Sequence, residues 1–353
     1  MIGIVSFLSP RYAQFIYKYT AILDEESIDY EVVFWNRELD NYSQNKNWIG
    51  YDKEVNTFQP FYKKIGSFIS FSYFMYKTIL KKKYDKLIIL TTQTAIPLAP
   101  LLLSKYKEKY IYDYRDITYE NFSLYKHIVN SLVKKSLFTA ISSKGFVESQ
   151  FLDESNKFVI SHNTRNFKLM KIDKVRSKKT RITYWGMVRQ PEFNKKVCDF
   201  FSKFKNIELT YHGAGYHKEI QKYCQLKEYR NIIFTGKYNL SDIEDFVQNT
   251  DFVLNAYEND KQQQPAMTVK FYDSVMYQLP MIVTKNSYMS KIVSDFNLGL
   301  NIDWNEKVDI EKEINNFDWE KYRESNKYVF NSINNDDRIF KDCVVKFCKD
   351  IKF

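Results

Sequence analysis

The segment Phe252–Thr284, FVLNAYENDKQQQPAMTVKFYDSVMYQLPMIVT, has the pattern of a strand, a polar loop, a helix and a second strand. Residues 252–254 and 281–283 are short apolar runs, which are typical of strands buried in a parallel sheet. Residues 268–278 carry apolar side chains at helical spacing, and Pro280 marks the end of that helix because proline restricts the residue before it. The expected buried face of the helix carries Val269, Tyr272, Val275 and Met276.

The polar loop of this segment opens onto the start of the helix. Pro265 suits a first helical turn, because its φ is fixed and its missing N–H is no loss there. Helix N-termini attract anions, since their N–H groups and the helix dipole both favour negative charge. Lys270 lies near the first turn and Asp273 follows one turn later. Such a pair would suit a sugar nucleotide, because the amine of Lys270 could bind the diphosphate and the carboxylate of Asp273 could bind the ribose hydroxyls. The alternative to a sugar-nucleotide site is that this segment is an ordinary β-α-β unit whose lysine lies on the surface.

Residues 268–273, TVKFYD, and 278–282, QLPMI, resemble the donor-binding helix of GT-B glycosyltransferases. The resemblance is to the retaining, GT4-like kind that acts in bacterial capsular and surface-polysaccharide biosynthesis. It implies two Rossmann-like parallel-sheet α/β domains facing a central cleft, with the helix N-terminus near Thr268 at the donor phosphates.

The chain departs from the family pattern at two acidic positions. The family usually has Glu where this chain has Asp273, and it has a second acid eight positions earlier, where this chain has Pro265. Glu258 or residues 262–264 could replace that second acid.

Composition predicts a globular chain of about two domains. The chain has 353 residues, of which 44% are hydrophobic and 27% charged. Its four cysteines form no C-x-x-C pair and its four histidines lack ligand spacing, which favours reduced cytosolic thiols over disulfides or zinc.

Residues 1–8 are too short for a secretory signal, and the most apolar stretch, 87–103, is interrupted by polar residues and prolines. No D-x-D motif occurs, which argues against a metal-dependent GT-A enzyme. We therefore expect a cytoplasmic protein, free or at the inner face of the cell membrane, that needs no metal or other cofactor.

The N-terminal half alternates between strand and helix patterns. Strands are expected at 2–7, 30–35, 87–90, 109–114, 137–141 and 158–160. Helices are expected at 10–23, 95–106, 123–135 and 143–152. This alternation predicts a parallel sheet covered by helices on both faces, in which ligands bind beyond the carboxyl ends of the strands.

Charged residues gather at one of those strand ends. Asp113, Arg115 and Asp116 follow a buried strand, where burial would normally exclude charge. With Arg11 in a neighbouring loop they predict an acceptor-binding site, in which Asp116 orients or deprotonates an acceptor hydroxyl. The alternative is a local salt bridge that pins the loop.

Residues 61–86 combine lysines with aromatic residues. Ten lysines face only two acidic residues between positions 61 and 109. Such a basic aromatic helix suits an anionic membrane surface. Two alternatives stay open: the aromatics pack in the core while the lysines are solvated, or the segment binds nucleic acid, although no nucleic-acid motif accompanies it.

The second half resembles the donor domain of the family. After an expected strand at 181–185, Gly186 lets the chain turn sharply. The resemblance places a diphosphate-binding arginine at Arg189 and a lysine some six residues further on, at Lys195 or Lys196. An arginine can stabilise a departing nucleotide without a metal.

The resemblance also assigns three residues that follow later strands. Gly213 and Gly215 would allow the backbone to approach a nucleotide, although such a glycine pair is common in turns. Tyr238 ends the strand and turn expected at 232–238, which the family places against the base.

Together these patterns predict a hexosyltransferase-type glycosyltransferase with an acceptor domain at 1–165 and a donor domain at 166–330. A helix at 331–353 is expected to pack back on the first domain. The enzyme would move a sugar from a nucleoside diphosphate to a lipid-linked or oligosaccharide acceptor, retaining configuration. The leaving diphosphate would be stabilised by Arg189, Lys195 and Lys270. The alternatives are a non-catalytic protein that binds sugar nucleotides or glycans, and a basic nucleic-acid-binding protein.

Overall fold

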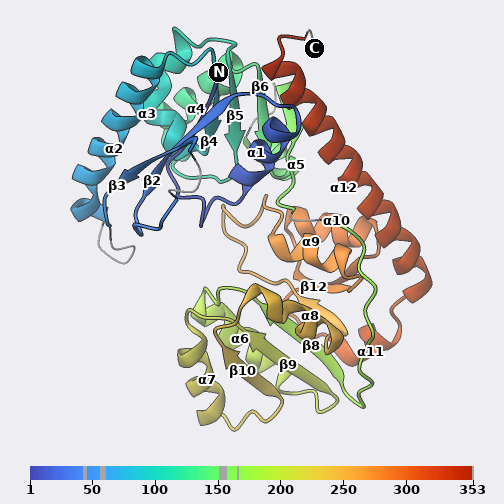
Figure 1. Cartoon of the computed structure of the whole chain (residues 1–353). Coiled ribbons are helices and arrows are strands. Elements are labelled where there is room, and N and C mark those ends of the chain that lie inside the picture. The colour runs from blue at the N-terminus through green and yellow to red at the C-terminus, as the bar shows by residue number, and fades with distance from the viewer. Residues whose placement is uncertain (43–45, 56–60, 151–156, 165–166, 352–353) are drawn as a thin grey trace. The chain divides into compact units, whose positions relative to one another are not determined.

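The computed structural model describes residues 1–42, 46–55, 61–150, 157–164 and 167–351, and it divides the chain into two compact units (Figure 1). The first unit comprises Met1–His162 and Asn335–Phe353, and the second comprises Asn163–Asn334. Part of the expected boundary, Arg165 and Asn166, lies outside the described residues.

The first unit contains a seven-stranded sheet in the order β3-β2-β1-β4-β5-β6-β7, and every neighbouring pair is parallel. Its strands are β1 (Ile2–Ser6), β2 (Tyr30–Asn36), β3 (Trp48–Asp52), β4 (Lys86–Leu90), β5 (Tyr110–Tyr114), β6 (Phe138–Ile141) and β7 (Phe158–Ile160). Its helices are α1 (Phe15–Glu25), α2 (Phe61–Lys82), α3 (Thr92–Leu103), α4 (Ser123–Lys135) and α5 (Lys144–Gln150). The expected parallel sheet is confirmed, and β3 is an edge strand that the sequence did not predict.

The second unit contains a six-stranded parallel sheet in the order β10-β9-β8-β11-β12-β13. Its strands are β8 (Thr180–Trp185), β9 (Ile207–His212), β10 (Ile232–Gly236), β11 (Phe252–Leu254), β12 (Met281–Thr284) and β13 (Gly299–Ile302). Its helices are α6 (Pro191–Phe201), α7 (His217–Leu226), α8 (Ile243–Gln248), α9 (Val269–Met276), α10 (Tyr288–Asp295) and α11 (Ile310–Asn315). The strand, loop, helix and strand expected between 252 and 284 are therefore present as β11, α9 and β12.

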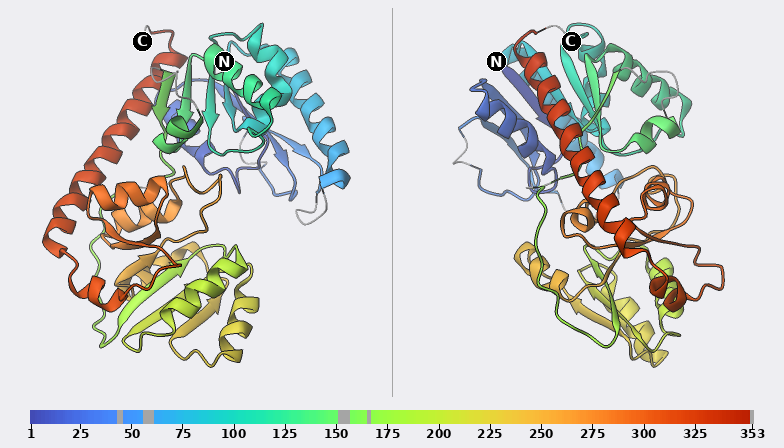
Figure 2. Two further views of the ribbon diagram at one scale, coloured as in Figure 1. Left: turned by 180° about the vertical axis from the view of Figure 1, so that it is seen from behind. Right: turned by 90° about the vertical axis from the view of Figure 1, so that its right-hand side faces the viewer.

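The last helix, α12 (Trp319–Cys348), is continuous over 30 residues (Figure 2). Its final part belongs to the first unit, where Phe340, Val344 and Phe347 join the buried cluster around β1, β2 and β4. The Phe340 ring packs edge-on against Tyr19, with 5.3 Å between the ring centroids. Burying one such side chain stabilises a fold by about 1.5–3 kcal/mol, so this short C-terminal segment contributes to the stability of the first unit.

Helix α9 begins at Val269, one residue after the predicted start at 268, but it differs from the expectation in its buried face. Pro265 does not form its first turn, because the residues before the helix form a separate turn, closed by Ala266 N–H donating to Gln263 O. The expectation that Val269 and Met276 are buried is also wrong: Val269 is 43% exposed and Met276 is partly exposed. The face against the sheet instead carries Phe271, Tyr272, Ser274 and Val275. Two of the four predicted residues, Tyr272 and Val275, are thus buried as expected, and the error at the other two arises because apolar residues occur on both sides of the helix.

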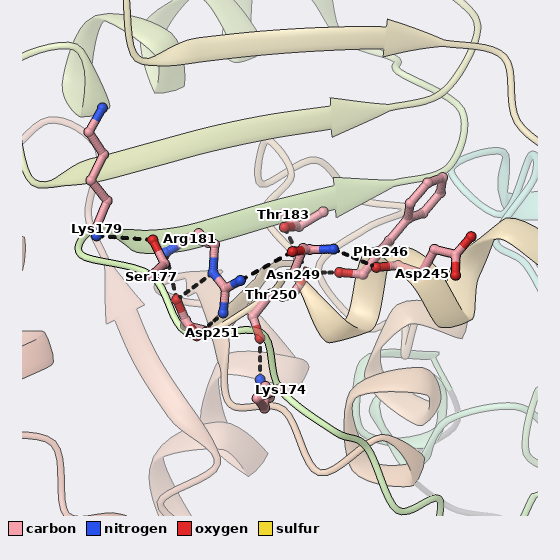
Figure 3. A network of polar contacts seen from close by, with 10 residues as sticks. All are labelled: Lys174, Ser177, Lys179, Arg181, Thr183, Asp245, Phe246, Asn249, Thr250 and Asp251. Carbon is pink, nitrogen blue, oxygen red and sulfur yellow. Dashed lines mark hydrogen bonds and ion pairs between the residues drawn. The ribbon is translucent and has the colours of Figure 1, made fainter.

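A basic segment, residues 167–179, leads into β8 and is fixed at the amino end of the second sheet (Figure 3). The Lys174 ammonium donates to the Thr250 carbonyl, and Val175 N–H donates to Gln248 O at 3.1 Å. Arg181 forms a two-pronged ion pair with Asp251, with N···O distances of 2.9 and 3.1 Å. Lys174, Val175, Arg181 and Asp251 line a cavity of about 340 Å³. Their contacts set the point at which β8 enters the sheet.

Candidate functional site

The loops that follow β8 and β11 meet at the carboxyl edge of the second sheet. The two strands are hydrogen-bonded neighbours in the middle of this sheet. Ligands of open α/β sheets bind at this edge. Gly186 ends β8 with φ +130°, a conformation that favours glycine, and its N–H donates to His212 O at 2.9 Å. The turn carries the chain into residues 187–190, and α9 begins after the β11 loop.

Lys270 is a buried cation at this edge. It is the second residue of α9, and it is only 6% exposed. Its ammonium donates to the Tyr257 hydroxyl and lies 4.0 Å from the centroid of the Tyr184 ring and 4.9 Å from that of Tyr257. Within the described part of the chain, no carboxylate forms an ion pair with it. Because an unneutralised buried charge is unfavourable, this arrangement favours the arrival of an anion.

The two tyrosines around Lys270 keep their protons at neutral pH. Burial raises the pKa of Tyr257 to about 12, and the nearby Arg189 opposes that shift. Burial likewise raises the pKa of Tyr184 to about 12, with Lys270 opposing it. The Tyr184 hydroxyl donates to Met187 O at 2.7 Å, which ties the β8 loop to the same group. Both phenols are therefore neutral, and Lys270 has no anionic partner in either of them.

Arg189 adds a second cation. Its side chain is exposed in the loop that follows β8, and its positive charge opposes the rise that burial causes in the pKa of Tyr257. Its guanidinium forms no hydrogen bond or ion pair with any described residue. Its carbonyl is fixed by Asn194, whose side-chain amide donates to it at 2.6 Å. Arg189 and Lys270, which were predicted as a pair, both act on Tyr257: Lys270 donates to its hydroxyl, and the charge of Arg189 opposes the rise in its pKa.

Asp273 and Thr268 lie on the same helix, but both are already engaged with protein groups. The indole N–H of Trp185 donates to the Asp273 carboxylate at 3.0 Å. The Thr268 hydroxyl donates to the Asn255 side-chain oxygen at 2.8 Å and does not cap the helix. The first N–H groups of α9 therefore have no side-chain cap from Thr268, so the anion-attracting end of the helix is retained.

Gly213 and Gly215 hold the β9 loop against the β8 loop. A Cβ on Gly213 would lie 1.7 Å from Gly186 O, and one on Gly215 would lie 2.4 Å from Val188 O. The loops are joined by two backbone hydrogen bonds, Val188 N–H to Ala214 O at 2.8 Å and Tyr216 N–H to Val188 O at 2.9 Å. The close approach found here is between protein loops, and approach to a nucleotide stays a prediction.

The structure does not bring Lys195 into this group. Its ammonium pairs with Glu192 and Glu219, each at 2.7 Å, and hydrogen bonds to those carboxylates raise its pKa. The other expected lysine, Lys196, donates to Asn305. Both ammonium groups are therefore engaged away from Tyr257. The ring of Tyr238, which was predicted to lie against the base, packs edge-on against Phe246, with 5.4 Å between the ring centroids.

Sequence reasoning missed Tyr257, Tyr184 and Gln190. Gln190 has left-handed backbone angles, and its side chain accepts from Glu258 N–H at 3.1 Å and donates to Asp260 at 3.3 Å. It thereby ties the β11 loop to the start of α6. The tyrosines carried no motif, and their only signal was their position at or just after a strand end. Among the suggested replacements for the missing acid, Glu258 is exposed, and no described residue hydrogen-bonds to its carboxylate.

In the first unit, the charged group after β5 is largely a buried ion pair. Arg115 donates to Asp113 at 2.6 and 2.9 Å, and the Tyr19 hydroxyl donates to the same carboxylate at 2.7 Å. Arg115 also donates to the Ser161 carbonyl at 3.0 Å and to its hydroxyl at 2.8 Å. Asp113 is fully buried, so for these two residues the structure favours the salt-bridge alternative over acceptor binding.

Two predicted acceptor residues remain on the surface of the first unit. Asp116 is exposed immediately after the buried pair. Arg11 is exposed and lies 3.4 Å from the Asp40 carboxylate. The pair of Asp113 and Arg115 therefore positions the loop that presents Asp116.

The described residues contain no group of three His, Cys, Asp or Glu side chains placed to hold a metal ion. None of their helices combines the length and apolar character that spanning a membrane requires.

Comparison with known proteins identifies the fold. No protein-family model matches the chain, and no curated protein matches it in sequence. Sucrose-phosphate synthase from Thermosynechococcus elongatus superposes with a TM-score of 0.73 at 12% identity, over 98% of this chain and 99% of that one. HepE from Anabaena, solved with UDP-glucose, gives 0.64 at 14% identity, over 99% and 97%. The catalytic domain of starch synthase IV from Arabidopsis thaliana, bound to ADP and acarbose, gives 0.67 at 11% identity, over 99% of each chain. The chain has the GT-B fold, as its sequence predicted.

Proposed function

We propose that this protein is a glycosyltransferase that moves a sugar from a nucleoside diphosphate to an acceptor hydroxyl. The observation that carries the proposal is Lys270, a buried ammonium on the first turn of α9 at the carboxyl edge of a parallel sheet. No carboxylate among the described residues pairs with it. The GT-B fold supports the proposal, as do structural neighbours that were solved with UDP-glucose or with ADP.

The chemistry required of the site is charge stabilisation. In sugar transfer the bond between the anomeric carbon and the diphosphate oxygen breaks, and negative charge grows on that oxygen. We assign this charge to Lys270 and Arg189, with the N-terminus of α9 contributing its dipole. Two cations and a helix dipole can do this without a divalent metal, so we propose a metal-independent reaction. Asp273 is proposed to bind the donor ribose.

The finer assignment is to a retaining, GT4-like hexosyltransferase of capsular or surface-polysaccharide biosynthesis, at the inner face of the membrane. It is supported by the resemblance of residues 268–273 and 278–282 to that group. A lipid-linked glycan is the proposed acceptor, and Asp116, exposed in the first unit, is proposed to orient or deprotonate its hydroxyl.

Turnover of a panel of UDP- and ADP-sugars tests the proposal. A donor first selected by thermal shift should be hydrolysed slowly, and transferred when a glycan acceptor is added. Lys270→Ala and Arg189→Ala should each lower kcat about a hundredfold, because each removes a cation from the leaving group. Lys222→Ala, which removes an exposed lysine on α7, is the matched control and should keep wild-type activity. Equal activity of all three variants would refute the assignment.

A non-catalytic sugar-nucleotide-binding protein is the second candidate. It is favoured by Pro265, which is buried where the related enzymes have an acid. In that case a donor would still raise the melting temperature, and Lys270→Ala would abolish that rise, but no hydrolysis or transfer would be measured.

A further inference from the structure

Helix α2 lies along the outside of the first unit and uses only one face for the core (Figure 1). It packs against β2 and α3. Its buried side chains, Phe71, Met75 and Ile79, are fully inaccessible and repeat every four residues. This row meets the packing needs of the helix, so the apolar residues on its other faces need a different explanation.

A second apolar row runs along an exposed face of α2. We call it the outer stripe; its residues are Ile65, Ile69, Tyr73, Tyr76 and Leu80. Their spacing of four, four, three and four residues places them on one side of the helix. Ile69 is 65% exposed and Tyr73 is 58% exposed, so the core does not cover the row. Contiguous apolar rows of this kind usually mark a binding surface.

The charged residues of α2 itself all have one sign. Residues 61–82 contain no aspartate or glutamate. Lys77 lies over the Tyr73 ring, with its ammonium 4.7 Å from the centroid, and Lys81 makes no ion pair with any residue that the structure describes. Lys82, by contrast, pairs with Glu31 at 2.6 Å. The side chain of Lys63 lies outside the described part. The stripe is therefore apolar and aromatic, with available cations beside it.

We propose that α2 docks this protein onto an anionic lipid bilayer. The outer stripe would enter the boundary between headgroups and acyl chains, while Lys77 and Lys81 bind lipid phosphates. The charge pattern selects this occupant. A second copy of the chain would bring lysines against lysines, and a nucleic-acid backbone would leave the apolar stripe uncovered. The inference stands on the first unit alone and does not depend on sugar transfer.

Vesicle flotation of the full chain tests the proposal. Wild-type protein should float with vesicles that contain phosphatidylglycerol, and at least tenfold less with vesicles of phosphatidylcholine alone. Lys77→Glu with Lys81→Glu should lower binding to the anionic vesicles at least tenfold, and Ile69→Ser with Tyr73→Ser should do the same without changing charge. Lys218→Glu with Lys222→Glu, on α7, makes the same charge change on the second unit and should bind as wild type does. All changed side chains are exposed, and melting temperatures check that each variant folds.

Three results would overturn the proposal. The first is binding that ignores lipid charge, and the second is equal binding by the α2 variants and the α7 control. The third is a dimer in light scattering that Ile69→Ser with Tyr73→Ser dissociates while no vesicles are bound, which would assign the stripe to a second copy. Turnover plays no part in these measurements, so loss of membrane binding and loss of the transferase assignment can be told apart.

Discussion

The two lysines assigned to the donor from sequence differ in how their charge is balanced. Lys195 is neutralised by Glu192 and Glu219, so an incoming diphosphate would compete with two carboxylates already in place. Lys270 is held by the Tyr257 hydroxyl and by two aromatic rings, which attract the cation without cancelling its charge. Lys270 is largely buried before a ligand arrives, and for this reason it can act more strongly on a developing anion than an exposed lysine can.

Tyr257→Phe tests that arrangement, because it keeps the ring and removes the hydroxyl that accepts from Lys270. A hydrogen bond to a charged group contributes about 1.5–3 kcal/mol, so the Kd for the nucleoside diphosphate should rise roughly tenfold or more. Tyr328→Phe, which changes an exposed tyrosine of α12, is the control. Calorimetric titration measures both, and an unchanged Kd for Tyr257→Phe would show that the hydroxyl does not position Lys270.

The spacing of residues in the sequence predicted which side chains lie on the same helix or strand. It did not predict which side chains are brought together by the course of a loop. Lys270 and Asp273 are one turn apart on α9, and that relation is local. The approach of Tyr257 to Lys270 depends on the course of a loop of more than ten residues, which no local pattern encodes. For Asp113 and Arg115 the sequence left two alternatives open, and burial favoured the ion pair.

The β8 and β9 loops form one interlocked element. Gly213 permits this, because its Cα faces the Gly186 carbonyl. If the two loops separated, neither Arg189 nor the Tyr184 hydroxyl would keep its position at the edge of the sheet.

Gly213→Ala should therefore separate the loops. A Cβ placed 1.7 Å from a backbone oxygen cannot be accommodated without backbone movement, so we expect a loss of about 2–4 kcal/mol in unfolding free energy and weaker nucleotide binding. Gly66→Ala is the control: a Cβ there meets nothing within 4 Å, and alanine in a helix should stabilise by about 0.5–1 kcal/mol. Urea unfolding measures both variants, and equal stability would contradict the steric role of Gly213.

His212 joins three elements and makes them sensitive to acid. It ends β9, hydrogen-bonds Thr235 of β10 at 2.8 Å, and stacks on Phe246 of α8 with ring centroids 3.6 Å apart. Burial lowers the pKa of His212 from 6.5 to about 4. Because the unfolded chain binds the proton more readily, stability is complete above about pH 6.5 and falls as the pH drops toward 4.

At pH 5 this one group should lower the unfolding free energy by about 2 kcal/mol relative to pH 7.5. Urea unfolding at the two pH values measures the difference, and His212→Gln should reduce it by that amount. A His212→Gln variant with the same pH dependence as wild type would show that other groups cause the acid sensitivity.

Elements with strong apolar runs were predictable, and elements at the margins of the sheets were not. β11 and β12 are buried apolar runs, whereas β3 is an edge strand with partly exposed side chains and no such run. On α9 the burial of Val269 and Met276 was wrongly predicted, because residues on both sides of the helix satisfy the same spacing and only the position of the sheet decides between them.

At the scale of the whole chain, alternation of strands and helices was sufficient for the fold. Both units contain parallel sheets, and the chain has the GT-B fold although no family model matches it. This agreement reflects physical rules that do not depend on sequence identity to known proteins: parallel strands buried on both faces need apolar runs, and most connections between them carry a covering helix. The donor sugar and the acceptor depend instead on a few loop side chains, which the alternation does not specify.

The central claim is that the cation at Lys270 binds a diphosphate without a divalent metal. Calorimetric titration of UDP, and separately of ADP, into wild type and Lys270→Ala in the presence of a chelator tests it most directly. We predict that at least one nucleotide binds wild type under these conditions, and that Lys270→Ala raises its Kd at least about tenfold. Binding that requires added magnesium, or binding that is the same in wild type and Lys270→Ala, would contradict the claim.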